Sequence, residues 1–168
     1  MTLDLHGLPG VALRPARPAD EPFLCALYAS TRQAELAATD WLPEQIDAFL
    51  ADQFALQSRH YAEHYADAAF SVVEQDGEPV GRLIVLAGAD EVRLVDVSLV
   101  AERRGRGLGT ALVQRVLAAA SGRRVVLHVE VFNPALRLYE RLGFRAAEQV
   151  GAYWRMEAEP GAPDGAEA

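Results

Sequence analysis

The chain has 168 residues, of which 51% are hydrophobic and 24% charged, so its size and composition fit one globular domain. The 24 acidic and 16 basic residues give a net charge of −8, which argues against nucleic acid as a partner. No apolar run approaches the ~20 residues that cross a bilayer, and the first residues lack the pattern of a signal peptide. The single cysteine, Cys25, cannot form an internal disulfide. We therefore expect a cytoplasmic protein without a membrane partner.

The first part of the chain is expected to form one strand and two helices. Residues 11–17 have a strand pattern, and a helix is predicted to begin near Asp20, a suitable N-cap residue. The apolar pattern breaks around residues 30–41. A long helix follows from about Pro43, a residue that fits the first turn of a helix. Its apolar residues recur at the helical period and are Ile46, Phe49, Leu50, Phe54, Tyr61 and Tyr65.

The rest of the chain is expected to alternate between strands and helices. Asp76-Gly77 predicts a tight turn between two strands. The predicted strands are 69–74, 80–86, 92–100, 124–131, 144–150 and 153–157, and the predicted helices are 105–120 and 133–142. This order is typical of an α+β fold with a mixed sheet, not of a strict βαβ alternation. We expect one domain over residues 1–159 and a disordered tail over residues 160–168, which are rich in Pro, Gly, Ala and acidic residues.

A glycine-rich segment joins the predicted strand 92–100 to the helix that follows it. Glycines allow the backbone to approach a ligand, and the free N–H groups of a first helical turn favour an anion such as a pyrophosphate. Arg104 and Arg106 would add positive charge. The chain has no lysine, which excludes a Walker A loop, and Thr110 stands where a dinucleotide motif has its last glycine. The alternative is a tight turn without a ligand.

Two segments resemble one known family. Arg104-Gly-Arg-Gly-Leu-Gly109 resembles the Arg/Gln-x-x-Gly-x-Gly/Ala signature of the Gcn5-related N-acetyltransferase (GNAT) superfamily. Residues 127–144, which contain Asn133, Tyr139 and Gly143-Phe144, resemble a second segment of that superfamily. The two motifs occur in the family's order and spacing and together cover about residues 92–145. The resemblance implies a GNAT-like fold: a mixed, mostly antiparallel sheet of about six or seven strands with a splayed parallel pair, flanked by about four helices.

The resemblance also implies acetyl-CoA as cosubstrate, bound in the gap between the splayed strands. Backbone groups of Val97, Ser98 and Leu99 would meet the pantetheine arm, and Asn133 would contact the same arm. The pyrophosphate would lie on the segment that follows, whose expected binding residues are Arg104, Gly105, Arg106, Gly107, Leu108, Gly109 and Thr110. This arrangement would hold the thioester at a fixed depth, where an amine can attack it directly.

Three residues are candidates for catalysis of acetyl transfer to a primary amine. Tyr139 matches the family tyrosine near the sulfur and would act as general acid, or it is a packed aromatic residue. His128 is a candidate general base because its ordinary pKa is near 6.5, or it is a half-exposed strand residue. Asp96 would attract the amine or relay its proton, or it is a solvated acid. Glu130 is a weaker candidate, and a water chain would replace any of them.

The acceptor site carries no motif. It would lie between the first two helices and the last two strands, and the residues to test there are Glu35, Trp41, Tyr61 and Tyr153. The acceptor is expected to be a small amine, an amino acid or a protein N-terminus. The net negative charge weakly favours a cationic acceptor. Many members of the family form homodimers. A homodimer is therefore an expected partner, although the sequence contains no interface signature.

Two other functions compete with this interpretation. His60-Tyr-Ala-Glu63-His64 matches the H-x-x-E-H pattern of a zinc hydrolase, which would need a third ligand such as Glu140. Because short patterns arise by chance, we predict no metal. The second alternative is a non-catalytic domain that binds or senses acyl-CoA. Cys25 lies far from the motifs and is expected to be a small core residue, not a nucleophile.

Overall fold

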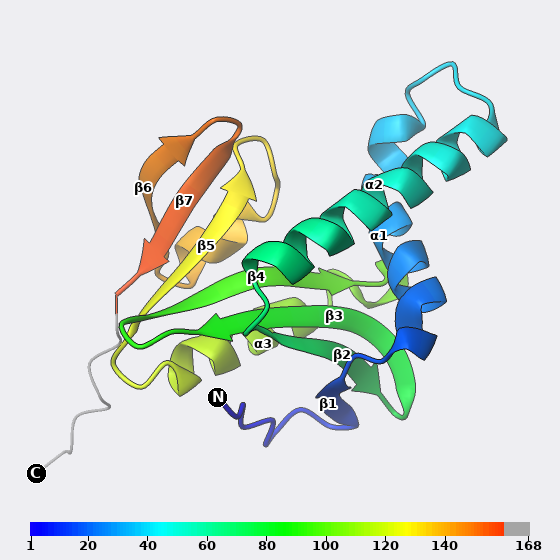
Figure 1. Cartoon of the computed structure of the whole chain (residues 1–168). Helices are drawn as coiled ribbons and strands as arrows, with labels where there is room; N and C mark the ends of the chain where they lie inside the picture. The colour runs from blue at the N-terminus through cyan, green and yellow to red at the C-terminus, as the bar shows by residue number, and fades with distance from the viewer. Residues whose placement is uncertain (160–168) are drawn as a thin grey trace, which may run out of the picture.

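The structure, a computed structural model, describes residues 1–159. Seven strands and four α-helices within this range form a sheet with helices on both faces (Figure 1). The elements are β1 (Val11–Pro15), α1 (Glu21–Leu36), α2 (Pro43–His64), β2 (Ala69–Gln75), β3 (Glu78–Ala87), β4 (Glu91–Leu99), α3 (Leu108–Ala119), β5 (Arg124–Glu130), α4 (Leu136–Arg141), β6 (Arg145–Val150) and β7 (Tyr153–Ala158). The expected tail at 160–168 lies outside the described residues.

The sheet has the order β1-β2-β3-β4-β5-β7-β6, and every neighbouring pair is antiparallel except the parallel pair β4–β5. This confirms the expected fold class: a mostly antiparallel sheet with one parallel pair and four flanking helices. The half of the sheet formed by β5, β7 and β6 turns away from the half formed by β1 to β4 (Figure 1).

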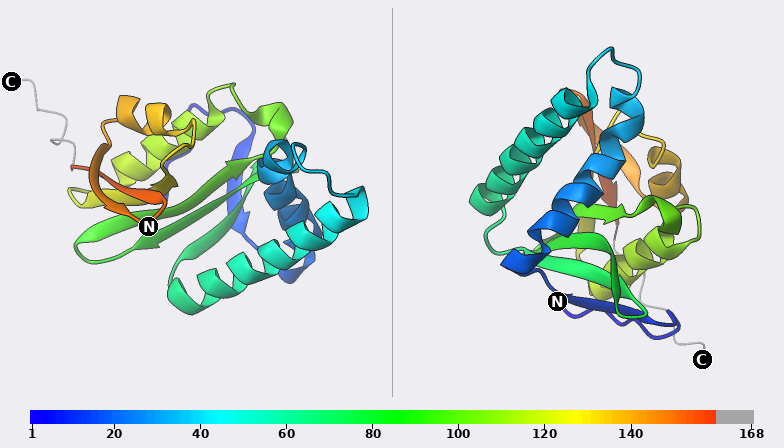
Figure 2. Two further views of the ribbon diagram at one scale, coloured as in Figure 1. Left: turned by 90° about the horizontal axis from the view of Figure 1, so that it is seen from above. Right: turned by 90° about the vertical axis from the view of Figure 1, so that its right-hand side faces the viewer.

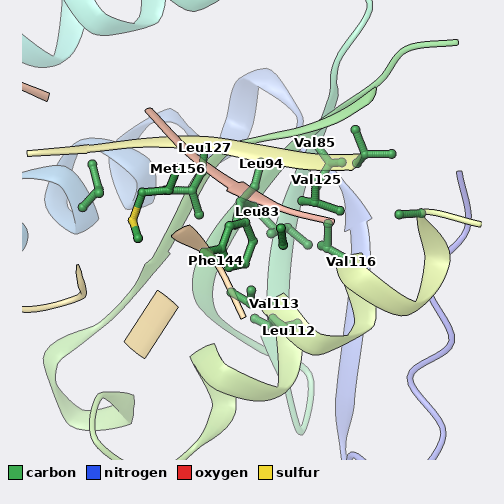
Figure 3. Close-up of a cluster of buried hydrophobic side chains, with 14 of the residues drawn as sticks. Leu83, Val85, Leu94, Leu112, Val113, Val116, Val125, Leu127, Phe144 and Met156 are labelled. Atoms are coloured by element: carbon green, nitrogen blue, oxygen red, sulfur yellow. The ribbon is translucent and has the colours of Figure 1, made fainter. Parts of the chain in front are cut away.

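Helices α1 and α2 cover one face of the sheet, and α3 and α4 cover the other (Figures 1 and 2). The main core lies under α3 and α4, where Leu112, Val113 and Val116 of α3 pack on side chains of the strands (Figure 3). Phe144, directly after α4, is 2% exposed and fills the centre of this core. A smaller cluster joins α1 to α2 through Tyr28, Leu36, Leu50 and Phe54. Cys25 packs against that cluster as a half-buried free thiol, as expected of a small core residue.

The tight turn predicted at Asp76-Gly77 is confirmed between β2 and β3. Asp76 and Gly77 have φ values of +54° and +83°, the left-handed conformation that a two-residue type I′ hairpin requires at both positions.

The first helix is longer than its apolar pattern indicates. α1 continues through Ser30 and Thr31 to Leu36, because both hydroxyls donate hydrogen bonds to carbonyls one turn earlier, at 2.7 and 2.6 Å. Such back-bonding lets polar side chains remain inside a helix.

Asp20 precedes α1 as predicted, but its carboxylate makes no capping hydrogen bond to the helix. It accepts two hydrogen bonds from Arg14 at 2.8 Å and one from the Arg17 N–H at 2.7 Å, and so ties the start of α1 to β1.

Within residues 1–159, each helix is either too short or too polar to span a lipid bilayer.

Candidate active site

The centre of the site is a gap between β4 and β5. Parallel pairing of these strands ends at Leu94 and Leu127, although β4 continues to Leu99 and β5 to Glu130. Beyond that point β4 stays paired with β3 and β5 stays paired with β7, so the two strands diverge (Figure 1). This is the splayed pair that the resemblance implied.

An irregularity in β4 determines which side chains face this gap. The pairing with β3 moves from Leu94–Val85 to Asp96–Ile84, which leaves Val95 without a partner. A one-residue bulge reverses the alternation of side chains. Leu94 faces the α3 core before the bulge, and Leu99 faces it afterwards. Asp96 therefore lies on the opposite face of the sheet, beneath α2.

The register also determines which backbone groups of β4 are free. The Val100 N–H donates to the Val80 carbonyl at 2.9 Å, so residues 98 and 100 point their backbone groups toward β3. The backbone groups of Val97 and Leu99 consequently point away from β3, whereas those of Ser98 do not. The Leu99 carbonyl already accepts a hydrogen bond from Arg104 Nε, so the Leu99 N–H and both groups of Val97 are free. This geometry favours Val97 and Leu99 over Ser98 for backbone contact with a bound chain.

The glycine-rich loop lies at the end of β4 and opens to solvent. Gly105 and Gly107 have φ values of +68° and +86°, and a Cβ placed on either residue would meet nothing within 4 Å. The first helical hydrogen bond runs from the Ala111 N–H to the Gly107 carbonyl at 2.9 Å. The N–H groups of Leu108, Gly109 and Thr110 therefore lack helical partners and are available to an anion.

The two loop arginines differ in their surroundings. Arg106 is exposed and forms no side-chain hydrogen bond or ion pair with the described part of the chain, so it is free to meet an anion. Arg104 is already engaged: its Nε donates to the Leu99 carbonyl at 2.8 Å and its Nη2 donates to the Ser30 hydroxyl at 2.9 Å. Arg104 thus ties the loop to α1, a role that the sequence did not indicate.

Asn133 lies just after β5, at the start of the turn into α4. Its Oδ1 accepts a hydrogen bond from the Ala135 N–H at 2.9 Å, so the carbonyl side of the amide is used locally. The NH₂ side remains available as a donor.

Tyr139 of α4 packs against the main core, within range of the charge of Asp96 on β4. Burial raises the pKa of Tyr139 to about 12, and the negative charge of Asp96 acts in the same direction. The ring packs edge-on against Phe144 with centroids 5.7 Å apart. The phenol therefore keeps its proton at neutral pH in a site shielded from water, as a hydrogen donor to a leaving group requires.

Asp96 is held by two side chains. Its Oδ2 accepts from Arg82 Nε at 2.5 Å, and its Oδ1 accepts from the Ser98 hydroxyl at 2.9 Å. Arg82 is 7% exposed and also donates to Gln57 of α2 at 2.9 Å. Sequence reasoning did not single out Arg82, although one arginine in the apolar run from Val80 to Leu86 was the available signal.

His128 belongs to a different group of charges. Its pKa is lowered, first by burial and then by the positive charges of Arg93 and Arg155, which outweigh the opposing charges of Glu91 and Glu148. Tyr139 thus feels the charge of Asp96, whereas His128 feels the charges of two arginines and two glutamates. A neutral imidazole is favoured there, as a base requires.

The four residues expected at the acceptor site do not form one cluster. Tyr61 lies beside the gap: its ring stacks under Arg82 at 5.6 Å, and burial raises its pKa, followed by the charge of Asp96. Tyr153 is 45% exposed at the other rim, where its hydroxyl lies 3.5 Å from a Glu130 carboxylate oxygen.

Glu35 and Trp41 are engaged elsewhere. Glu35 forms an ion pair with Arg32 at 2.9 Å, and Trp41 packs edge-on against Phe49 at 5.2 Å. Of the four candidates, only Tyr61 and Tyr153 have neighbours in the gap.

The histidines of the H-x-x-E-H pattern are stacked on each other. The rings of His60 and His64 have centroids 4.2 Å apart, and His64 Nδ1 lies 2.9 Å from the His60 carbonyl. Over residues 1–159, no three His, Cys, Asp or Glu side chains are grouped so as to hold a metal ion. The third ligand that the zinc alternative needs is therefore not found in this range.

Comparison with known proteins identifies the family. Residues 31–144 match the Acetyltransferase (GNAT) family, so the chain belongs to that family, as its two motifs indicated. Mycothiol acetyltransferase of Corynebacterium glutamicum is 35% identical over 126 residues, covering 72% of this chain and 42% of the relative. An N-alpha-acetyltransferase of Sulfurisphaera tokodaii is 31% identical over 113 residues, covering 56% of this chain and 68% of the relative.

Solved structures agree on the fold. A paia N-acetyltransferase from Thermoplasma acidophilum in complex with coenzyme A superposes with a TM-score of 0.67 at 16% identity, covering 89% of this chain and 98% of that one. An acetyltransferase from Thermus thermophilus gives a TM-score of 0.63 at 24% identity, covering 91% and 97%. The chain spans less than half the length of the mycothiol acetyltransferase of C. glutamicum.

Proposed function

We propose that the protein is an N-acetyltransferase that moves an acetyl group from acetyl-CoA to a primary amine. The single observation that carries this proposal is the gap between β4 and β5, which ends in an open anion-binding loop. Tyr139 supports it as a buried phenol whose pKa is raised first by burial and then by the charge of Asp96. Membership in the acetyltransferase family and a neighbour crystallised with coenzyme A support acetyl-CoA as cosubstrate. Cytoplasmic location and a homodimer stay predictions.

The proposed binding mode uses the free groups of the gap and the loop. The backbone of Val97 and Leu99 would hold the pantetheine arm as an added strand, with the Asn133 amide beside it. The pyrophosphate would lie on the N–H groups of residues 105–110, with Arg106 supplying charge. Arg104 would act indirectly by fixing the loop to α1.

The proposed reaction is a direct attack. The neutral amine adds to the thioester carbonyl, the tetrahedral intermediate collapses, and the C–S bond breaks as the new C–N bond remains. The amine loses one proton, and the departing sulfur receives one. Tyr139 would supply the hydrogen to the sulfur, since its raised pKa keeps the phenol protonated at neutral pH. His128, Asp96 or an ordered water would receive the proton from the amine.

The acceptor would enter between α1 and α2 on one side and the β6–β7 hairpin on the other. Tyr61 and Tyr153 lie on these two sides, and the charge of Arg32 on α1 acts on the Tyr153 phenol, so the two walls are near each other. One relative is named mycothiol acetyltransferase and another N-alpha-acetyltransferase, which supports keeping both a small amine and a peptide N-terminus as candidates.

The test is release of free thiol from acetyl-CoA in the presence of a panel of amines, amino acids and short peptides, with product mass confirmed. Acetylation of at least one acceptor, lost on Tyr139→Phe, supports the proposal. One-to-one acetyl-CoA binding without turnover on any acceptor would instead support the non-catalytic acyl-CoA-binding alternative.

A further inference from the structure

A hollow lies between the C-terminal end of α2 and the hairpin of β3 and β4. Its volume is about 470 Å³, in the range of sites that bind small molecules. His60, His64 and Tyr65 line it from the helix, and Leu86, Glu91 and Arg93 line it from the strands. The hollow therefore combines aromatic walls with a charged floor, and of these residues only Glu91 and Arg93 entered the site described above, through their effect on His128.

The floor of the hollow belongs to a network with more arginines than carboxylates. Arg93 and Arg155 share the carboxylate of Glu91, at 2.9 and 3.3 Å. Glu157 pairs with Arg155 and also with Arg124, the latter at 3.0 Å. Three guanidinium groups thus share two carboxylates, and Glu148, opposite Arg155 in the β6–β7 pairing, adds a third negative charge nearby. The side chains of Arg93 and Arg155 are 25% and 23% exposed, so both remain within reach of a ligand.

The pKa of His128 responds to the charges near the floor of the hollow. The charges that reach it come from Arg93, Arg155, Glu91 and Glu148, and the two arginines have the larger effects. Arg93 and Arg155 therefore lie close enough to His128 to affect its pKa, although the whole chain has a net charge of −8. An anion at Arg93 would be attracted by both guanidinium groups and opposed by Glu91.

The hollow and the residues beside the gap are neighbours along α2 and β4. The rings of Tyr65, in the hollow, and Tyr61, beside the gap, have centroids 5.9 Å apart. Along β4, Arg93 precedes Asp96 by three residues, a backbone distance of about 10 Å. A short peptide spans this distance, and the long Arg93 side chain shortens it for an acidic amino acid whose amine lies near Asp96.

We propose that Arg93, supported by Arg155, binds a carboxylate of the acceptor, so that the acceptor class is acidic amino acids or peptides with an acidic group near the amine. This inference rests on the proposed function. It reverses the weak preference for a cationic acceptor that the net charge suggested, because the local arrangement of charges decides which ligand binds.

The test uses no acetyl-CoA, so it is independent of turnover. The chain has four histidines, and imidazole NMR resolves the pKa of His128 once His128→Gln identifies its signal. The probes are succinate, the neutral succinamide of similar shape, and inorganic phosphate. A bound anion offsets the charges of Arg93 and Arg155, so succinate should raise the pKa of His128 saturably by about half a unit or more.

Two variants make the comparison specific. Arg93→Gln should abolish the effect of succinate. Arg59→Gln is the matched control, because Arg59 is an exposed neighbour of His60 on α2 that forms no ion pair with the described residues, and it should leave the effect intact. Equal responses to succinate and succinamide, or an unchanged response in Arg93→Gln, would overturn the proposal. A saturable response to phosphate alone would overturn the assignment to a carboxylate.

Turnover provides a separate readout. For an acceptor carrying a carboxylate, Arg93→Gln should raise KM tenfold or more with little change in kcat, whereas the amide counterpart of that acceptor should be unaffected. Succinate binding without turnover on any amine would contradict the proposed function and leave the anion site standing. Turnover whose KM is the same for the acceptor with the carboxylate and for its amide counterpart would support the proposed function and contradict the anion site.

Discussion

Arg104 Nη2 donates a hydrogen bond to the hydroxyl of Ser30, 2.9 Å away and 74 residues earlier in the chain. The same guanidinium holds the Leu99 carbonyl at the end of β4 through Nε, at 2.8 Å. One side chain therefore connects α1, β4 and the glycine-rich loop. The glycine-rich loop, proposed to bind the cofactor, is thereby tied to α1, which forms one wall of the proposed acceptor site.

We predict opposite profiles for the two loop arginines. Arg104→Gln should lower the free energy of unfolding by about 1–3 kcal/mol, because it leaves the Leu99 carbonyl and the Ser30 hydroxyl with fewer partners. Arg106→Gln should change stability by less than about 0.5 kcal/mol but weaken acetyl-CoA binding. Urea unfolding and calorimetric titration measure the two effects, and equal profiles would contradict the distinction.

Gly107→Val should abolish acetyl-CoA binding, because its side chain would occupy the open space where the pyrophosphate is proposed to lie. The variant also carries backbone strain of about 1–3 kcal/mol at φ +86°. Gly122→Val is the control, since Gly122 has φ +80° and equally open surroundings but follows the far end of α3. It should show similar destabilisation with normal affinity. Loss of binding in both variants would point to a general folding defect.

Tyr139→Phe should lower kcat by roughly 10²-fold or more while acetyl-CoA affinity changes little. The phenylalanine ring keeps the packing against Phe144, so thermal unfolding should stay close to that of the parent protein. If kcat and affinity fall together, Tyr139 is a packing residue and not the acid.

The pH profile distinguishes the candidate bases. The pKa of His128 is lowered from its ordinary value near 6.5, so His128 is neutral above that pH and gains a proton below it. If His128 is the base, the rate should be constant above about pH 6.5 and fall at lower pH, with the pKa as the midpoint. Arg93→Gln should move this limb to higher pH by removing a positive charge. A limb that persists in His128→Gln would transfer the role to Asp96 or water.

The sequence predicted the splayed strands and the open glycine-rich loop, which the structure contains. The loop residues and Tyr139 lie on short continuous segments, where glycine spacing and a strand-to-helix order are visible without any tertiary information. Their roles toward acetyl-CoA stay predictions. The ion pair of Arg82 could not be predicted in the same way, because its formation depends on the register between neighbouring strands. The register in turn depends on the bulge at Val95. In the sequence this bulge is visible only as a shift in the alternation of apolar residues, from the even positions Val92 and Leu94 to the odd positions Val97 and Leu99.

The acceptor residues were the least predictable for the same reason. Tyr61 and Tyr153 are 92 positions apart in the chain, one on α2 and the other on β7. Their relative placement depends on how α2 and the β6–β7 hairpin are arranged in the fold, which the sequence alone does not show. Glu35 and Trp41 have suitable chemistry, but each is engaged by a local partner, Glu35 by Arg32 and Trp41 by Phe49.

The measurement that tests the central claim most directly is calorimetric titration of the protein with acetyl-CoA, with NAD and ATP as controls. The proposed site predicts saturable binding of one acetyl-CoA per chain and much weaker binding of both controls, because only acetyl-CoA has a pantetheine arm to fill the gap between β4 and β5. Absence of acetyl-CoA binding, or equal binding of all three ligands, would contradict the account and leave the glycine-rich loop as a structural turn.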